Sequence, residues 1–202
     1  MPKQQVTKDD WIQAALTAVA RGGIAAVRVD VLAKDLGITR GSFYWHFADR
    51  EALLVAMLEW WERVLTTEII ERLEKVDSPL ERYHDIVANA FFGRRDRNGI
   101  EPALAANADD PIVAPFLRRV TTARLRFLTQ LFADLGLPEP AARQRALVTY
   151  GAFVGWLQLR HTSPDTVPEL MATATEPMAE HLTSLLLADI DTQTTRAPGT
   201  GP

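Results

Sequence analysis

One segment decides the fold: residues 28–47 read RVDVLAKDLGITRGSFYWHF. Its spacing predicts two short helices that meet at a sharp turn. Ala33 is small enough for the helices to approach closely, Gly37 can adopt the positive φ that ends the first helix, and Phe43 can fill the angle between them. These features together are typical of a helix-turn-helix. The alternative interpretation is a pair of packed helices with no role in DNA binding.

The polar residues of this segment are expected on the face opposite Phe43. In a helix-turn-helix, the N-terminal end of the second helix enters the major groove. Hydroxyl, indole and imidazole groups there can donate to phosphates, as can an arginine at the start of the next helix, where free amides also favour an anion. Four of these residues have a second interpretation. Tyr44, Trp45 and His46 could instead pack against their neighbours, and Thr39 could instead serve as a helix cap. The predicted DNA contacts are Arg28, Thr39, Arg40, Gly41, Ser42, Tyr44, Trp45, His46 and Arg50.

Caps and apolar spacing indicate helices on both sides of the segment. Thr7 and Asp10 form a predicted capping box for a first helix, which Gly22-Gly23 ends. Asp49 is placed to cap a fourth, long helix that is predicted to run to about Val76.

The rest of the chain also has helical periodicity, and no stretch shows the alternation of a strand. We therefore predict an all-α fold of about nine helices, in which a DNA-binding head with a helix-turn-helix is followed by a C-terminal helical bundle. Pro177 is expected to split or kink the last helix. Helices are expected at about 30–36, 40–47, 79–93, 102–108, 112–136, 140–161 and 167–188. The predicted divisions are residues 1–47, which contain the helix-turn-helix, residues 48–190, a helical body, and residues 191–202, a disordered tail.

The run from Ile38 to Phe47, ITRGSFYWHF, followed by DREAL at residues 49–53, closely resembles the tetracycline-repressor-like (TetR) family. The resemblance is specific over about residues 7–60. It implies that residues 1–47 form a three-helix DNA-binding domain, joined through a long fourth helix to a helical body, residues 48–190, that binds ligand and dimerises. It also implies a repressor that a small-molecule effector releases from a palindromic operator.

Two positions depart from the family pattern. The family often has threonine or serine near the start of the second helix, where this chain has Arg28-Val29. Arg28 is expected to reach a phosphate in its place. The common lysine at the start of the fourth helix is Arg50 here, which keeps the charge.

The resemblance also suggests where the chain dimerises and where an effector binds. A helix that carries Gly151 and Gly155 four residues apart can approach another helix closely, and the last helix offers an apolar seam; packing inside one subunit is the alternative use of both glycines. The predicted dimer interface is Gly151, Ala152, Gly155, Leu182, Leu185 and Leu186. Aromatic residues of the body could line an apolar cavity, although most must be ordinary core. The predicted pocket is Trp60, Trp61, Phe91, Phe127 and Trp156.

Composition argues against several other classes of protein. The chain has no cysteine, which excludes disulfides and cysteine-bound metals. Its four histidines show no metal-ligand spacing, and no serine nucleophile arrangement is visible. We therefore expect no metal, no cofactor and no enzymatic activity. No apolar run reaches the roughly 20 residues of a membrane span, and no signal peptide is visible, so a cytoplasmic location is expected.

The distribution of charge fits a small DNA-binding module on a larger acidic body. The net charge is −4, but residues 1–50 hold seven lysines and arginines against five aspartates, so this part is at +2 and the remainder at −6. Two other functions stay open. One is an activator or a ligand-independent regulator with the same head, and the other is a helical small-molecule-binding protein that has lost DNA binding.

Overall fold

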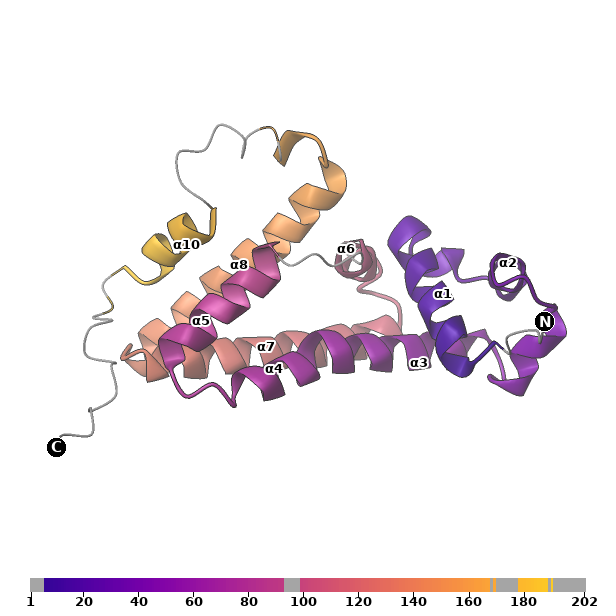
Figure 1. The fold of residues 1–202 in the computed structure, drawn as a ribbon, viewed down its shortest axis with the longest axis horizontal. Coiled ribbons are helices and arrows are strands. Elements are labelled where there is room, and N and C mark those ends of the chain that lie inside the picture. Colours follow the sequence, from indigo (N-terminus) through magenta and orange to yellow (C-terminus); the bar gives the residue numbers. More distant parts are fainter. Residues whose placement is uncertain (1–5, 93–98, 168, 170–177, 189, 191–202) are drawn as a thin grey trace, which may run out of the picture. The chain divides into compact units, whose positions relative to one another are not determined.

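The computed structural model describes residues 6–92, 99–167, 169, 178–188 and 190, and every regular element among them is a helix (Figure 1). This confirms the predicted all-α class. The expected split at Pro177 and the expected tail, residues 191–202, lie outside the described residues. The α-helices are α1 (Lys8–Gly22), α2 (Val29–Asp35), α3 (Arg50–Glu62), α4 (Glu68–Leu73), α5 (Pro79–Val87), α6 (Ile100–Ala105), α7 (Val113–Asp134), α8 (Glu139–Thr162) and α10 (Met178–Leu186). Two 3₁₀ segments, η1 (Ile24–Ala26) and η2 (Arg40–Trp45), and two π-helical turns, η3 (Arg63–Thr67) and η4 (Ala88–Phe92), complete the description.

The chain folds into two compact units. The first unit is Met1–Thr66 together with Arg95–Val120, and the second is Thr67–Arg94 together with Thr121–Pro202. The boundary that we predict after residue 47, between DNA binding and ligand binding, lies inside the first unit. The first unit extends further because the buried side chains of α3 and α6 belong to the same core as those of α1.

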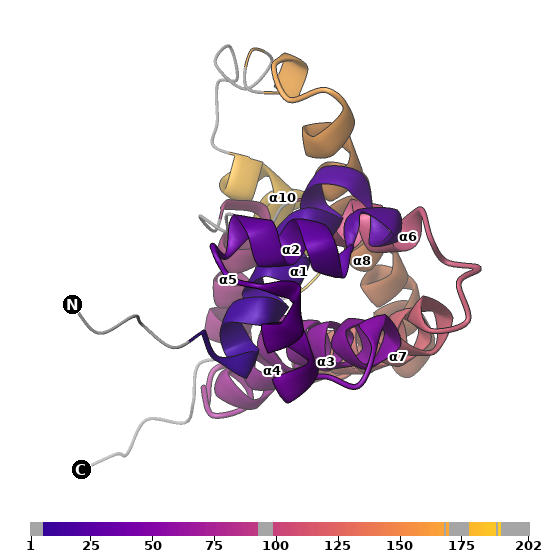
Figure 2. The ribbon, with the colours of Figure 1, turned by 90° about the vertical axis from the view of Figure 1, so that its right-hand side faces the viewer.

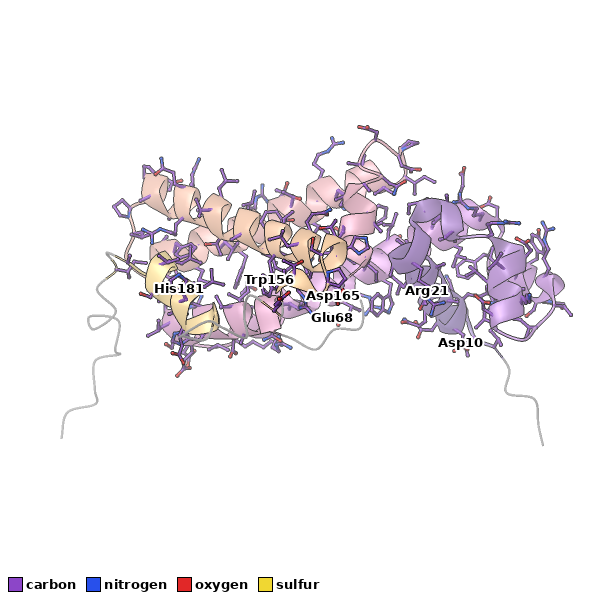
Figure 3. All side chains as sticks on the ribbon, turned by 90° about the horizontal axis from the view of Figure 1, so that it is seen from above. Asp10, Arg21, Glu68, Trp156, Asp165 and His181 are labelled. Atoms are coloured by element: carbon purple, nitrogen blue, oxygen red, sulfur yellow. The ribbon has the colours of Figure 1, made fainter. Side chains whose placement is uncertain are left out.

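Helix α1 begins with the predicted capping box. The Thr7 hydroxyl accepts a hydrogen bond from the Asp10 amide at 3.2 Å, and the Asp10 carboxylate accepts one from the Thr7 amide at 2.7 Å. The carboxylate also accepts a hydrogen bond from the Thr7 hydroxyl at 2.7 Å, and the bonds that it accepts from the Thr7 amide and hydroxyl hold the pKa of Asp10 below its usual value. Asp10 and Arg21 lie at opposite ends of α1 (Figure 3), where each charge complements the helix dipole.

The core of the first unit forms where α1 packs against α3 and α6 (Figure 1). The buried residues of α1 recur at the helical spacing read from the sequence: Trp11, Ile12, Ala15, Leu16 and Val19. At the start of α6, a Cβ added to Gly99 would lie only 2.7 Å from the Ala20 carbonyl oxygen. Any larger residue there would push α6 away from α1.

The predicted fourth helix is interrupted by a π-helical turn. Helix α3 ends at Glu62, η3 follows, and α4 ends at Leu73, three residues before the predicted end. The buried position after Trp61 is Thr66, five residues later, which is the spacing of a π-turn. An uninterrupted helical period would bury Val64 or Leu65, but both side chains are only half-buried at this turn.

The second unit has its own core, built from α4, α5, the C-terminal half of α7, α8 and α10. Tyr83 is fully buried in it, and its hydroxyl donates a hydrogen bond to the Leu182 carbonyl oxygen at 3.3 Å. Arg82 pairs with Asp134 at 3.0 Å and so links α5 to α7. Arg145 donates to the Leu186 carbonyl oxygen and so links α8 to the end of α10. These hydrogen bonds and this ion pair therefore connect helices of the second unit that are distant in the sequence.

Burial of Tyr83 makes the stability of the second unit sensitive to alkaline pH. Burial raises the pKa of Tyr83 to about 12, although a hydrogen bond with Thr183 and the charge of Arg145 oppose the shift. Because this folded-state pKa lies above the unfolded value of about 10, its contribution to stability is complete below about pH 10 and is lost as the pH rises through about 12. We expect Tyr83→Phe to remove this part of the pH dependence of the free energy of unfolding, measured by urea denaturation from about pH 9 to 12.

The exposed Tyr44 of the first unit provides a matched control. Tyr44→Phe removes a phenol that is 55% exposed and so controls for the loss of a tyrosine hydroxyl that is not buried. If the free energy of unfolding fell equally with pH in the wild type and in Tyr83→Phe, the alkaline loss of stability would not come from Tyr83.

Candidate functional site

Residues 28–47 fold as two short helical segments around a tight turn. Gly37 has a φ of +69°, as its position in the sequence predicts. Its amide donates to the Lys34 carbonyl oxygen at 3.0 Å, and the Ile38 amide donates to the Ala33 carbonyl oxygen at 3.0 Å. This pair of bonds is the Schellman arrangement, which closes the C-terminal end of α2 and reverses the chain.

The second segment, η2, differs from the α-helix that we predicted for residues 40–47. It is a 3₁₀-helix from Arg40 to Trp45, in which the Ser42 amide donates to the Thr39 carbonyl oxygen at 3.0 Å. Thr39 occupies the N-cap position, but its side chain makes no capping hydrogen bond. A six-residue segment that contains glycine and serine gains little from α-helical propagation, so the tighter 3₁₀ form is accessible.

Phe43 holds the two segments together. It is fully buried, and Ala33 opposite it is 3% exposed, so both residues play the parts that the sequence predicts. The Phe43 ring meets Trp11 of α1 edge-on, with 5.1 Å between ring centroids, and stacks on Phe47 at 5.6 Å. Helix α1 thus supports the helix-turn-helix from behind, and α2 packs beside α1 (Figure 2).

The predicted contact residues surround the exposed side of η2. Trp45 is 88% exposed and Tyr44 is 55% exposed. An indole this exposed does not cover its neighbours, so the packing alternative for Trp45 was wrong. Arg40 donates through Nη2 to the Tyr44 hydroxyl at 3.3 Å. Of the nine predicted residues, Ser42, His46 and Arg50 are half-buried, and the exposed ones are Arg28, Thr39, Arg40, Gly41, Tyr44 and Trp45.

Two of the predicted contact residues have partners inside the protein. Arg28 pairs with Asp30 at 3.0 Å, and both side chains are more than half exposed, so this ion pair stabilises the fold little and can exchange for a phosphate. Arg50 is more firmly held, because its guanidinium donates to the carbonyl oxygens of Val27 and Ile24. The sequence gives no sign of this pairing, since the partners lie 23 and 26 residues away.

The predicted dimer residues divide between two environments. Gly151 and Gly155 are exposed on α8 and Leu185 is exposed on α10, whereas Ala152 and Leu182 are half-buried and Leu186 is buried within the second unit. The structure adds four exposed apolar residues on α8 that we did not predict: Leu147, Val148, Val154 and Leu159. Their spacing of three and four residues from the two glycines was a signal that the sequence already contained.

The predicted pocket residues do not gather in one unit. Trp61 is buried in the core of the first unit and Trp60 packs against that core, whereas Phe127 and Trp156 belong to the second unit. The side chain of Phe91 lies outside the described residues.

The described part of the chain has no group of three or more histidine, aspartate or glutamate residues arranged to hold a metal ion. None of its helices combines the length and apolar character needed to cross a membrane.

A family model described as "Bacterial regulatory proteins, tetR family" matches residues 12–57, which run from α1 through the helix-turn-helix into α3. Over these residues the chain is similar to the TetR family. Among curated relatives, the uncharacterized HTH-type transcriptional regulator YuxN of Bacillus subtilis is 36% identical over 72 residues, which are 36% of this chain and 25% of YuxN. The chain therefore matches about a quarter of the length of that relative.

Solved structures share the fold over nearly the whole chain. A transcriptional regulator from Rhodococcus sp. Rha1 has a TM-score of 0.70 at 19% identity, covering 92% of this chain and 96% of that one. A transcriptional regulator from Saccharomonospora viridis in complex with choline has a TM-score of 0.62 at 15% identity, covering 92% of this chain and 95% of that one. At these identities the likeness concerns the fold alone.

The turn at Gly37 should be sensitive to any side chain. No atom lies within 4 Å of a Cβ added there, so the cost of Gly37→Ala is the strain of a positive φ and not a clash. We expect a loss of about 1 kcal/mol in the free energy of unfolding, measured by urea denaturation.

The matched control is Gly41→Ala. Gly41 does not have a positive φ, and its added Cβ would meet only the Thr39 hydroxyl at 3.8 Å. This variant should be neutral or slightly more stable than wild type. Equal losses at the two glycines would show that the turn is not specially constrained.

Proposed function

We propose that this protein is a DNA-binding transcriptional regulator that reads an operator through residues 28–47. The observation that carries the proposal is the helix-turn-helix itself, in which the Gly37 turn and the buried Phe43 present η2 with its polar and aromatic side chains exposed. The family match covers this same segment. DNA as the partner also implies action in the cytoplasm of a bacterial cell.

Each exposed side chain has a role that its chemistry suits. Arg40, at the first position of η2, can donate two hydrogen bonds to the edge of a guanine. Tyr44 can donate its hydroxyl to a phosphate, and its bond with Arg40 holds the two groups together. Trp45 offers an apolar ring with one N–H donor to a sugar or a thymine methyl group.

We propose that the protein acts as a homodimer joined through one face of α8. That face leaves Leu147, Val148, Val154 and Leu159 exposed, and α10 adds Leu185. A Cβ added to Gly151 or Gly155 would meet no atom within 4 Å, so a partner helix can approach closely there. An exposed apolar stripe of this length is uncommon on a monomer, and a two-fold dimer would cover it with its own copy. A dimer also supplies two half-sites, which a single short recognition segment needs for specificity.

We further propose that a small-molecule effector controls DNA binding, as a repressor released by its ligand. The similar regulator from Saccharomonospora viridis was solved with choline, which supports effector binding by this fold without identifying the effector here. An effector that binds one state of the dimer more tightly would change the separation of the two recognition segments and so weaken operator binding. The position of the DNA footprint relative to a promoter distinguishes a repressor from an activator.

Selection from a random pool of duplex DNA tests the proposed function. We expect the retained sequences to share a palindromic motif, because two equivalent recognition segments read two half-sites. Sequencing of the retained DNA after binding at low salt gives the result. If no sequence were enriched, residues 28–47 would not recognise a DNA sequence. That result would favour the alternative of a helical small-molecule-binding protein that has lost DNA binding.

Variants at η2 assign the contacts within that motif. Arg40→Ala should cost about 1–3 kcal/mol of discrimination at one base position of each half-site, if Arg40 contacts a base. Tyr44→Phe serves as the matched variant and should weaken binding to all sequences alike. An unchanged base preference in Arg40→Ala would assign Arg40 to a phosphate instead.

A charge on the apolar face of α8 tests the dimer. Val148 is 60% exposed in the single chain, so Val148→Glu should leave the fold intact while placing an unpaired charge in the interface. We expect the dimer dissociation constant, measured by sedimentation velocity, to rise by at least about a hundredfold. The control is Val31→Glu, since Val31 is an exposed valine of α2, outside this face. A Val148→Glu protein that remains as dimeric as Val31→Glu would exclude this face as the interface.

A further inference from the structure

Arg50 lies at the first residue of α3, directly after the N-cap Asp49. The N-terminal end of a helix carries partial positive charge, so a cationic side chain is unfavourable there unless it has partners. Its guanidinium is half-buried and turns back toward the residues that precede α2. Nε donates to the Val27 carbonyl oxygen at 2.7 Å, and Nη2 donates to the Ile24 carbonyl oxygen at 2.6 Å.

These two bonds use one of the two edges of the guanidinium that can bind an anion through a pair of parallel N–H groups. Arginine recognises a phosphate most strongly when two parallel N–H groups meet two oxygens. In this protein Nε and Nη2, which form one such edge, are both bound to main-chain oxygens. Binding a phosphate through that edge would break both internal bonds.

The two acceptors are well placed to serve as anchors. Val27 is fully buried and Ile24 is 4% exposed, so their side chains hold this part of the backbone in the core of the first unit. Both residues lie just before the helix-turn-helix, whereas Arg50 lies just after it. The guanidinium therefore joins the start of residues 28–47 to their end.

We infer that Arg50 is a positioning residue, which holds the helix-turn-helix in a set orientation on α3, and not a residue that neutralises a phosphate. This inference rests on the proposed DNA-binding function and replaces the phosphate contact expected from the sequence. The two carbonyl bonds connect the residues before α2 to the start of α3, so they stabilise one orientation of the helix-turn-helix. The charge of Arg50 offsets the partial negative charge of the two carbonyl oxygens and does not add to the DNA-binding surface.

Two variants of the full-length protein separate positioning from charge. Arg50→Met removes both hydrogen bonds and the charge. Arg50→Lys keeps the charge but replaces the planar guanidinium, which donates two parallel hydrogen bonds, with an ammonium group. The matched control is Arg28→Met, which removes an arginine whose side chain is 65% exposed and which is a predicted phosphate contact. Affinities are measured against a duplex recovered from the random pool and against a scrambled version of it, over a range of salt concentrations.

If Arg50 positions the helix-turn-helix, both Arg50 variants lose selectivity. We expect the ratio of affinities for the selected and scrambled duplexes to fall about tenfold in Arg50→Met and nearly as far in Arg50→Lys. The slope of log affinity against log salt should stay at the wild-type value in Arg50→Met, and it should fall by about 0.9 per lost contact in Arg28→Met. A purely structural role would lower both affinities equally and leave their ratio unchanged, which would overturn the inference.

A phosphate role gives a different pattern. Arg50→Lys would then bind like wild type, and Arg50→Met would lose salt dependence as Arg28→Met does. Two measurements on the protein without DNA give an independent result. The internal bonds predict that the Nε–H signal of Arg50 exchanges slowly in the NMR spectrum. They also predict a lower melting temperature for Arg50→Met than for the wild type. A rapidly exchanging Nε–H and an unchanged melting temperature would overturn the inference, even if the wild-type protein selected no duplex and the proposed function failed.

Discussion

The contact between Phe43 and Trp11 is the constraint on which the functional part of this protein depends. Segment η2 has only six residues, and its internal hydrogen bonds are those of a 3₁₀-helix, so it has little stability of its own. Its shape is maintained because the Phe43 ring is buried between Ala33, Phe47 and the indole of Trp11. The exposed side chains of Arg40 and Tyr44 point outward because Phe43 points inward.

A second requirement is that this short segment keeps its orientation on the rest of the first unit. The Schellman bonds at Gly37 determine the angle between α2 and η2, and the guanidinium of Arg50 ties the residues before α2 to the start of α3. The close approach of Gly99 to Ala20 brings α6 into the same core. The compact unit that carries the proposed DNA-binding surface is thus larger than the three-helix head expected from the sequence, because the cores of α3 and α6 are continuous with that of α1.

The exposed surfaces of the two units differ in chemistry. On η2 the exposed side chains are Arg40, Tyr44 and Trp45, which are polar or aromatic with a donor, and this suits a hydrated and charged partner such as DNA. On α8 they are aliphatic and are accompanied by two glycines, which suits a dry contact with another helix. Part of each patch could be predicted from the sequence. For the aliphatic patch, the predicted residues included Leu186, which is buried, and did not include Leu147 or Val148, which are exposed.

The sequence by itself determined the features that depend on residues a few positions apart. The capping box of Thr7 and Asp10, the Asp49 cap, the positive φ of Gly37 and the helical class all follow from local hydrogen bonds and backbone sterics. Only the tertiary structure decided that η2 is a 3₁₀-helix, that the buried face shifts at η3, that Trp61 is core, and that Arg50 binds carbonyl oxygens more than 20 residues away. These outcomes depend on which distant side chains compete for the same space and on small energy differences between helix types, and no local pattern of residues contains that information.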